Sequence, residues 1–134
     1  MEKRNVSIVL FIKDNKILLQ DRRGISKYGE EYAFFGGGIE NGETRDEALK
    51  REIKEELSIE IKNFKFFKRY SHIIKKLNKE IVRNVYVSSM PDLKKLNVKE
   101  GKIALMDFKD SFNLNVAEGD NEILREIYDF VNRK

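Results

Sequence analysis

The sequence lacks cysteine and contains one proline, Pro91, and one histidine, His72, among 134 residues. Without cysteine the chain can form neither disulfides nor thiolate metal sites, so carboxylates are the main option for binding a metal ion. A single histidine without a neighbouring carboxylate pattern favours a structural role for His72 over a catalytic one.

Long apolar runs are also absent. None approaches the roughly 20 residues that a membrane-spanning helix needs. The N-terminal residues Met1 to Arg4 lead into a strand-like pattern and not into the apolar core of a signal peptide. We therefore expect a cytoplasmic protein that does not use a membrane.

Length and composition indicate one soluble globular domain covering residues 1–134, with 37% charged and 40% hydrophobic residues. The net charge is +4. Because acidic residues concentrate between positions 40 and 56, the remaining surface is more basic than the total suggests, which would favour a polyphosphate ligand. An ordinary lysine-rich surface would produce the same total.

Apolar periodicity and turn residues predict strands and helices in the order strands, helix, strands, helix. The expected strands cover residues 5–12, 16–20, 32–35, 59–70 with a break near 63, 81–89 and 103–108, and the expected helices cover 44–57 and 121–131. Residues 92–102 and 111–120 are expected to be loops. The buried side of the last helix is expected to hold Ile123, Leu124, Ile127, Phe130 and Val131. This order predicts an α/β fold with a mixed sheet between helices.

The first helix has a clear start. Thr44 and Glu47 have the spacing of a capping box, in which each side chain bonds to the backbone N–H of the other residue. No glycine or proline interrupts the following residues up to Leu57, and Leu49, Ile53 and Leu57 form an apolar ridge.

Three carboxylates, Glu52, Glu55 and Glu56, lie on a neighbouring face of this helix within roughly 100° of arc. Glu52 and Glu56 are like charges at i,i+4, and Glu55 and Glu56 occupy the last turn, where the helix dipole disfavours anions. A hard divalent cation, Mg²⁺ or Mn²⁺, would compensate for these positions, so the three glutamates are predicted metal ligands. The alternative is a solvated acidic face, which is common on helices.

A longer pattern includes these glutamates. Gly37 is followed after five residues by Glu43 and after seven more by the segment 51–59, REIKEELSI. This spacing resembles the signature of the Nudix hydrolases, G-x5-E-x7-R-E-U-x-E-E-x-G-U, where U is a bulky aliphatic residue, and every charged position matches. Three positions depart from the family pattern. Ser58 replaces glycine, and Phe35 and Tyr32 stand where proline and tryptophan are frequent. Because serine adopts the left-handed conformation only at some cost, the first departure affects the exit of the helix and no metal ligand.

The resemblance implies an α/β/α sandwich around a mixed sheet and Mg²⁺-dependent hydrolysis of a nucleoside diphosphate linked to another group. The residues expected at the metal ion are Glu52, Glu55, Glu56, the carbonyl of Gly36 and a further carboxylate from a later loop, Glu100 or, as second choice, Glu118. Arg51 is expected to orient a ligand through ion pairs with Glu47 and Glu55 at i,i+4. Substrate phosphates are expected to contact Arg22 or Arg23 and the backbone at Gly37 and Gly38. One of the three glutamates could instead take the proton of the attacking water.

Two classes of function remain open at this point. The first is a pyrophosphohydrolase of nucleoside triphosphates, including oxidised ones, with sugar nucleotides, dinucleoside polyphosphates or RNA 5′ ends as other substrates. The second is a Nudix-type module that binds a nucleotide or nucleic acid without hydrolysing it, using basic pairs such as Lys75–Lys76 and Lys94–Lys95. The sequence leaves the oligomeric state open, including a homodimer.

Overall fold

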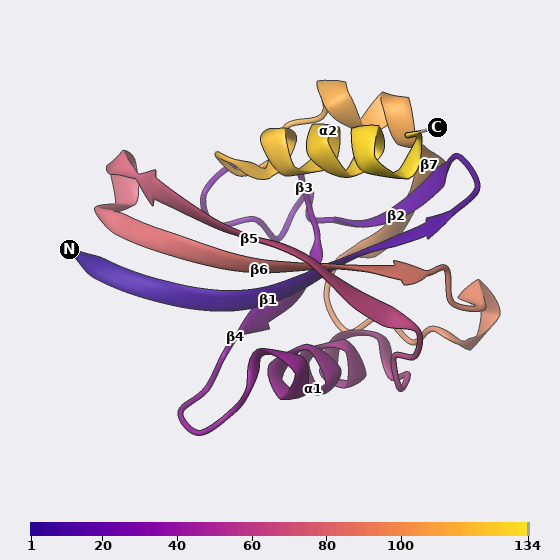
Figure 1. The fold of residues 1–134 in the computed structure, drawn as a ribbon, viewed down its shortest axis with the longest axis horizontal. Coiled ribbons are helices and arrows are strands. Elements are labelled where there is room, and N and C mark those ends of the chain that lie inside the picture. The colour runs from indigo at the N-terminus through magenta and orange to yellow at the C-terminus, as the bar shows by residue number, and fades with distance from the viewer. Residues whose placement is uncertain (134) are drawn as a thin grey trace.

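A computed structural model describes residues 1–133 and shows one sheet with a helix on each face, α1 on one side and α2 on the other (Figure 1). The elements in chain order are β1 (Glu2–Lys13), β2 (Lys16–Asp21), β3 (Tyr32–Ala33), β4 (Phe35–Gly38), α1 (Arg45–Leu57), β5 (Phe64–Ile74), the 3₁₀ turn η1 (Lys75–Leu77), β6 (Lys79–Ser89), η2 (Leu93–Lys95), β7 (Lys102–Asp107), η3 (Phe108–Asn113) and α2 (Asp120–Val131). The predicted α/β/α architecture is confirmed. No helix of residues 1–133 is long and apolar enough to cross a membrane.

The sheet is mixed, as the order of elements predicts. Its strands follow the order β3-β2-β1-β6-β5, with β4 paired to β1 and β7 paired to β2. β1 and β6 run parallel, and the other pairs are antiparallel. Ile8 of β1 lies opposite Val85 of β6 and opposite Gly36 of β4. This register places the glycine strand β4 beside the centre of the sheet.

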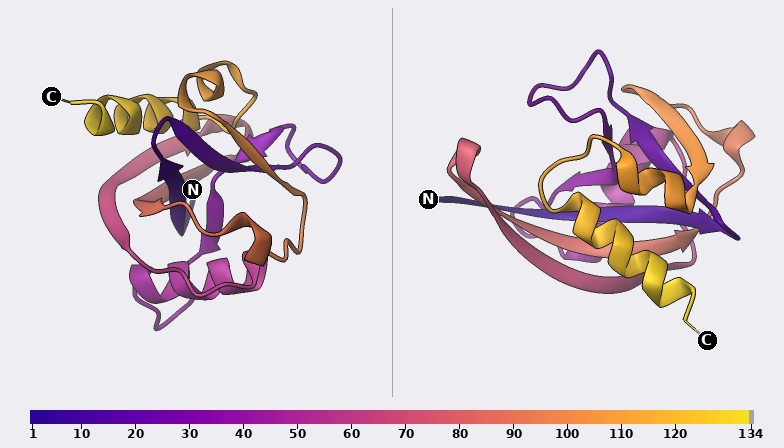
Figure 2. Two further views of the ribbon diagram at one scale, coloured as in Figure 1. Left: turned by 90° about the vertical axis from the view of Figure 1, so that its right-hand side faces the viewer. Right: turned by 90° about the horizontal axis from the view of Figure 1, so that it is seen from above.

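β1 is apolar on both faces because both faces are covered. Val6, Ile8 and Leu10 pack on the side of α2, together with Ile123 and Ile127 of that helix. The alternate residues pack on the side of α1 against its apolar ridge; this second core contains Val9, Phe11, Phe35, Leu49, Ile53 and Leu57. The two core layers fix both helices against the sheet. The turned views show α1 and α2 on opposite sides of the sheet (Figure 2).

Several element boundaries differ from the sequence-based expectations. The strand expected at 32–35 is split into β3 and β4, and β4 continues through the glycines to Gly38. Residues 59–63 form no strand, because Asn63 has a positive φ of 57°. β5 therefore begins only at Phe64. The loop expected at 111–120 begins inside η3.

The buried side of α2 is shorter than predicted. Phe130 and Val131 are 51% and 41% exposed, whereas Ile123, Leu124 and Ile127 are fully buried. The last turn of α2 projects past the sheet (Figure 2), where Phe130 makes an edge-to-face contact with Phe67 of β5 and lies under the guanidinium of Arg133. The expectation for these two residues was therefore wrong.

Candidate active site

Both ends of α1 are fixed by local hydrogen bonds. At the start, Thr44 Oγ1 accepts from Glu47 N at 3.1 Å and Glu47 Oε1 accepts from Thr44 N at 2.8 Å, which confirms the capping box. At the end, Ser58 adopts the left-handed conformation with φ 62° and ψ 31°, so serine takes the glycine-like position despite its Cβ. Glu47 is committed to the cap and not to Arg51, which corrects the expected i,i+4 pair.

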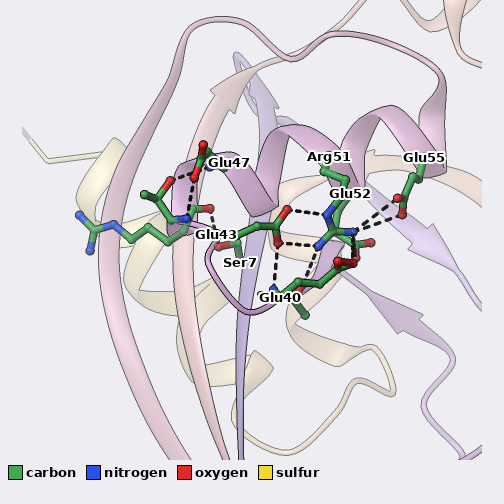
Figure 3. Close-up of polar contacts among 10 residues, drawn as sticks. Ser7, Glu40, Glu43, Glu47, Arg51, Glu52 and Glu55 are labelled. Atoms are coloured by element: carbon green, nitrogen blue, oxygen red, sulfur yellow. Dashed lines mark hydrogen bonds and ion pairs between the residues drawn. The ribbon is translucent and has the colours of Figure 1, made fainter.

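Arg51 instead joins α1 to the loop before it (Figure 3). Its Nε and Nη2 donate to the two carboxylate oxygens of Glu43 at 2.6 and 2.9 Å, and Nη2 also donates to the carbonyl of Gly38 at 2.9 Å. Its Nη1 donates to Glu52 Oε1 at 2.9 Å. The guanidinium fork holds the pKa of the Glu43 carboxyl down at about 2. Arg51 therefore fixes the glycine strand, the loop and Glu52 relative to one another.

Glu52 and Glu56 approach β4 at its glycines. A Cβ on Gly37 would lie 2.5 Å from the carboxylate carbon of Glu52, so only glycine leaves that space. Gly36 N donates to Glu56 Oε1 at 2.8 Å. The register of α1 against β4 thus places two carboxylates of the helix beside two consecutive glycines.

The carboxyl of Glu56 has a perturbed pKa. Burial, together with the neighbouring carboxylates Glu52 and Glu100, raises the pKa of Glu56 to about 7, although the N–H of Gly36 and the charge of Arg22 oppose the shift. Glu56 of α1 and Glu100 of the loop before β7 line the same cleft, and a cation bound there would be attracted by both carboxylates.

A cleft of about 1320 Å³ extends from Gly36, Gly37 and Glu56 over part of the sheet face on which α2 packs, where Val6 and Ile8 line it. Predicted site residues that line it are Arg22, Gly36, Gly37, Glu56, Glu100 and Glu118. Arg23 is not among them. Its Nη2 and Nε donate to Asp21 at 2.7 and 3.0 Å, which holds the pKa of the Asp21 carboxyl at about 2. Glu55 lies at the outside, 59% exposed, with Arg51 Nη1 at 3.4 Å.

The cleft also contains polar residues that sequence reasoning missed, chiefly Gln20 and Arg83. Arg83 is 6% exposed and donates from Nη1 to His72 Nδ1 at 2.9 Å and from Nη2 to the carbonyl of Glu118 at 3.0 Å. Its Nε lies 3.1 Å from Asp120 Oδ1, but the N–H is not aligned for a hydrogen bond, so this contact is an ion pair and the oxygen has no hydrogen-bond donor. A charged residue at an inward position of an otherwise apolar alternation was the signal available in the sequence.

Comparison with known proteins decides the family. The NUDIX domain family model matches residues 1–126 of the chain. The chain belongs to the Nudix family. The segment from Gly37 to Ile59 is its Nudix box, and the structure places that box at the β4–α1 junction described above.

Nudix relatives resemble this chain over part of their length. An 8-oxo-dGTP diphosphatase from Buchnera aphidicola is 32% identical over 77 residues, which are 58% of this chain and 59% of the relative. The nucleoside triphosphatase NudI of Escherichia coli is 42% identical over 60 residues, 42% of this chain and 41% of the relative. The chain therefore matches less than two thirds of the length of either relative.

Solved structures show the same fold over nearly the whole chain. The E. coli ORF135 protein superposes with a TM-score of 0.80 at 23% identity, covering 98% of this chain and 93% of that one. A MutT Nudix hydrolase from Burkholderia pseudomallei superposes with a TM-score of 0.74 at 20% identity, covering 94% and 98%. At these identities the likeness concerns the fold alone.

Nudix proteins typically depend on a divalent metal ion. Among residues 1–133, no three acidic or histidine side chains converge closely enough to hold one. The available donors nevertheless fit such an ion in kind, because carboxylate and carbonyl oxygens are the ligands of Mg²⁺ and Mn²⁺. Gly37 also leaves beside Glu52 a cradle that a Cβ would fill. Glu52 and Glu56 are the two carboxylates of α1 that lie beside the glycines of β4.

Proposed function

We propose that this Nudix protein is a Mg²⁺- or Mn²⁺-dependent pyrophosphohydrolase that cleaves nucleoside triphosphates, including oxidised ones, to a monophosphate and pyrophosphate. The observation that carries the proposal is the placement of Glu52 and Glu56 against Gly37 and Gly36, two glycines that line a large cleft together with Glu56. The names of the two partial relatives, an 8-oxo-dGTP diphosphatase and a nucleoside triphosphatase, support this substrate class.

The position of each site residue determines whether it would bind the metal ion or the substrate phosphates. Glu52, Glu56 and the carbonyl of Gly36 would hold the ion, with Glu55 and Glu100 as further carboxylates. When bound, the ion would neutralise phosphate oxygens and acidify a water molecule. Arg22 donates to phosphate oxygens from the opposite wall of the cleft, where its guanidinium is fixed by Glu30 and Gln20. The overall reaction adds one water across a phosphoric anhydride: one P–O bond breaks, the bridging oxygen leaves with one product, the water oxygen becomes bonded to the phosphorus of the other, and the protons of the water pass to the products or to solvent.

The glycines of β4 contribute to the site because they have no side chains. Gly36 and Gly37 line the cleft without side chains, so a phosphate chain can approach the main chain there. Arg51 stays behind this surface, bonded to Glu43 and Gly38, and orients Glu52. Its role is to position a ligand and not to touch the substrate.

The test is a substrate panel incubated with Mg²⁺, with the phosphate products identified. The panel contains nucleoside triphosphates, 8-oxo-dGTP, a sugar nucleotide, a dinucleoside polyphosphate and RNA with a 5′ triphosphate. We expect monophosphate and pyrophosphate from a triphosphate, loss of turnover with a chelator, and recovery with Mg²⁺ or Mn²⁺.

Glu56→Gln should keep the fold and reduce turnover by about 100-fold or more, because the amide cannot replace a charged ligand. Glu60→Gln is the matched control, since Glu60 is exposed and contacts only Lys54 among the described ion pairs. Near-normal activity of Glu56→Gln would remove the carboxylates from the mechanism.

A second candidate within the same chemistry is a substrate with more phosphates or a nucleic acid chain. The cleft is lined by five further cations that such a substrate could contact, Arg4, Lys27, Lys76, Lys79 and Lys99. Preferential turnover of the RNA or the dinucleoside polyphosphate in the panel would favour it, and binding of RNA without turnover would favour a non-hydrolytic module.

A further inference from the structure

Gln20 is a buried amide at the end of β2, where it lines the cleft and is only 3% exposed. The three residues before it, Ile17 to Leu19, are fully buried and apolar. A buried amide is unfavourable unless both its oxygen and its nitrogen find partners. Its partners therefore indicate what this residue does.

Both partners belong to the proposed site. Gln20 Oε1 accepts from Arg22 Nη1 at 2.8 Å, and Gln20 Nε2 donates to the backbone carbonyl of Glu100 at 3.0 Å. Because a guanidinium only donates and a carbonyl only accepts, the amide can have just one orientation here. One side chain thus joins two segments that lie 80 residues apart in the chain.

The segment around Glu100 is held closely on both sides of this bond. Lys99 N donates to the carbonyl of Glu56 at 3.0 Å, which ties the segment to the end of α1. Gly101 has a φ of +67°, and a Cβ there would lie 2.4 Å from the carbonyl oxygen of Asp21. Gln20 supplies the link between this segment and the neighbouring Arg22.

Arg22 is held from a second side by Glu30, whose Oε1 lies 3.3 Å from Arg22 Nε. With one bond from Nε and one from Nη1, the guanidinium keeps three of its five N–H groups for other acceptors. The plane of the guanidinium is therefore set by Glu30 and Gln20 while donors remain for a ligand in the cleft.

We propose that Gln20 is a positioning residue that fixes the phosphate-binding Arg22 and the carboxylate-bearing Glu100 segment relative to each other. The inference rests on the proposed function, because it takes Arg22 and Glu100 as parts of one substrate site. Its role depends on an amide, since each end of the side chain meets a different kind of partner.

Two substitutions of Gln20 distinguish the effect of its bond to Arg22 from the effect of its bond to the carbonyl of Glu100. Gln20→Met removes both bonds at similar volume and should lower kcat/KM by about 10–100-fold, with a higher KM because Arg22 loses its orientation. Gln20→Glu keeps an acceptor for Arg22 but places an oxygen against the carbonyl of Glu100. It should therefore keep KM close to that of the wild type, lower kcat and raise the Mg²⁺ concentration that gives half-maximal rate.

Ser111→Ala is the matched control. Ser111 is fully buried and its Oγ donates to the carbonyl of Phe108 at 2.7 Å, but it does not line the cleft. It should lower the melting temperature without changing KM or the Mg²⁺ dependence. Equal kinetic effects of Ser111→Ala and Gln20→Met, or unchanged kinetics in Gln20→Met, would overturn the proposal.

Binding without turnover provides a separate readout. In the presence of a chelator, we expect Gln20→Met to weaken the binding of a nucleoside monophosphate, and to weaken it much less in an Arg22→Met background, because the effect acts through Arg22. If the wild type hydrolyses no anhydride, the proposed function fails while this measurement still decides the role of Gln20. Unchanged affinity, additive effects in the double variant, or no nucleotide binding by the wild type would each contradict it.

Discussion

The three consecutive glycines of β4 should respond differently to the same substitution by alanine. At Gly37 a Cβ would lie 2.5 Å from the carboxylate carbon of Glu52 and 2.6 Å from its nearer oxygen. An ordinary contact is about 3.5 Å, so the carboxylate must move by about 1 Å. Because the obstructing atoms are the free end of a side chain and the backbone of Gly37 has no positive φ, the fold can accommodate the change.

Gly37→Ala should therefore keep its stability to within about 1 kcal/mol and lose about 100-fold in kcat, since a displacement of this size at a catalytic group has that effect. Gly36→Ala should instead unfold more easily, by about 3 kcal/mol. Its Cβ would lie 2.1 Å from the backbone oxygen of Ser7, and its φ is +135°.

Gly38→Ala is the matched control, because a Cβ there would make ordinary contacts with the Arg4 side chain, 3.7 Å from Nη2 and 3.8 Å from Nε. It should resemble the wild type in both properties. Urea unfolding and steady-state kinetics of the three variants test the series. Full activity of Gly37→Ala, or equal losses of activity in the Gly37 and Gly38 variants, would contradict the proposed role of Glu52.

Two further predictions concern the pair Arg22 and Arg23 and the carboxyl of Glu43. Arg22→Met should raise KM by about 10-fold or more. Arg23→Met should leave KM nearly unchanged, because Arg23 is paired with Asp21 outside the cleft. Steady-state kinetics of both variants measure this difference, and equal effects on KM would contradict it. The depressed pKa of Glu43, about 2 in the folded protein against an ordinary value of 4.5, predicts a contribution to stability that is present above pH 4.5 and is lost as the pH falls toward 2. Urea unfolding between pH 5 and 2 should therefore show a smaller decrease for Glu43→Gln than for the wild type, and parallel curves would contradict the assignment.

Local sequence rules predicted the start and the buried face of α1 well, because their determinants lie close together in the chain. The capping box at Thr44, the apolar ridge and the carboxylates depend on neighbours three or four residues away. The same rules failed for the partner of Arg51, since Glu47 and Glu43 both lie within eight residues and only the folded loop decides which one it binds.

Contacts between distant segments were beyond such rules. The bond from Gln20 to the carbonyl of Glu100 depends on the pairing of β2 with β7, and nothing in the local sequence of either segment specifies it. The different positions of Arg22 and Arg23 likewise follow from the turn after β2, which directs adjacent side chains to Glu30 and to Asp21. Phe130 belongs to the predicted apolar side of α2, but its side chain is exposed because the end of α2 extends past the sheet (Figure 2).

The charges beside the cleft determine which cations a polyphosphate needs in order to bind. Glu40, Glu43, Glu52 and Glu55 of α1 and its preceding loop surround the guanidinium of Arg51, and Glu56 of the same helix lines the cleft beside Gly36. A polyphosphate would be repelled by this excess of negative charge, so it can approach only when cations stand between the phosphates and the glutamates. Arg22 on the facing wall can neutralise part of the phosphate charge but not that of the glutamates. The proposed reaction therefore requires a bound divalent ion on the α1 side, and Arg22 cannot replace it.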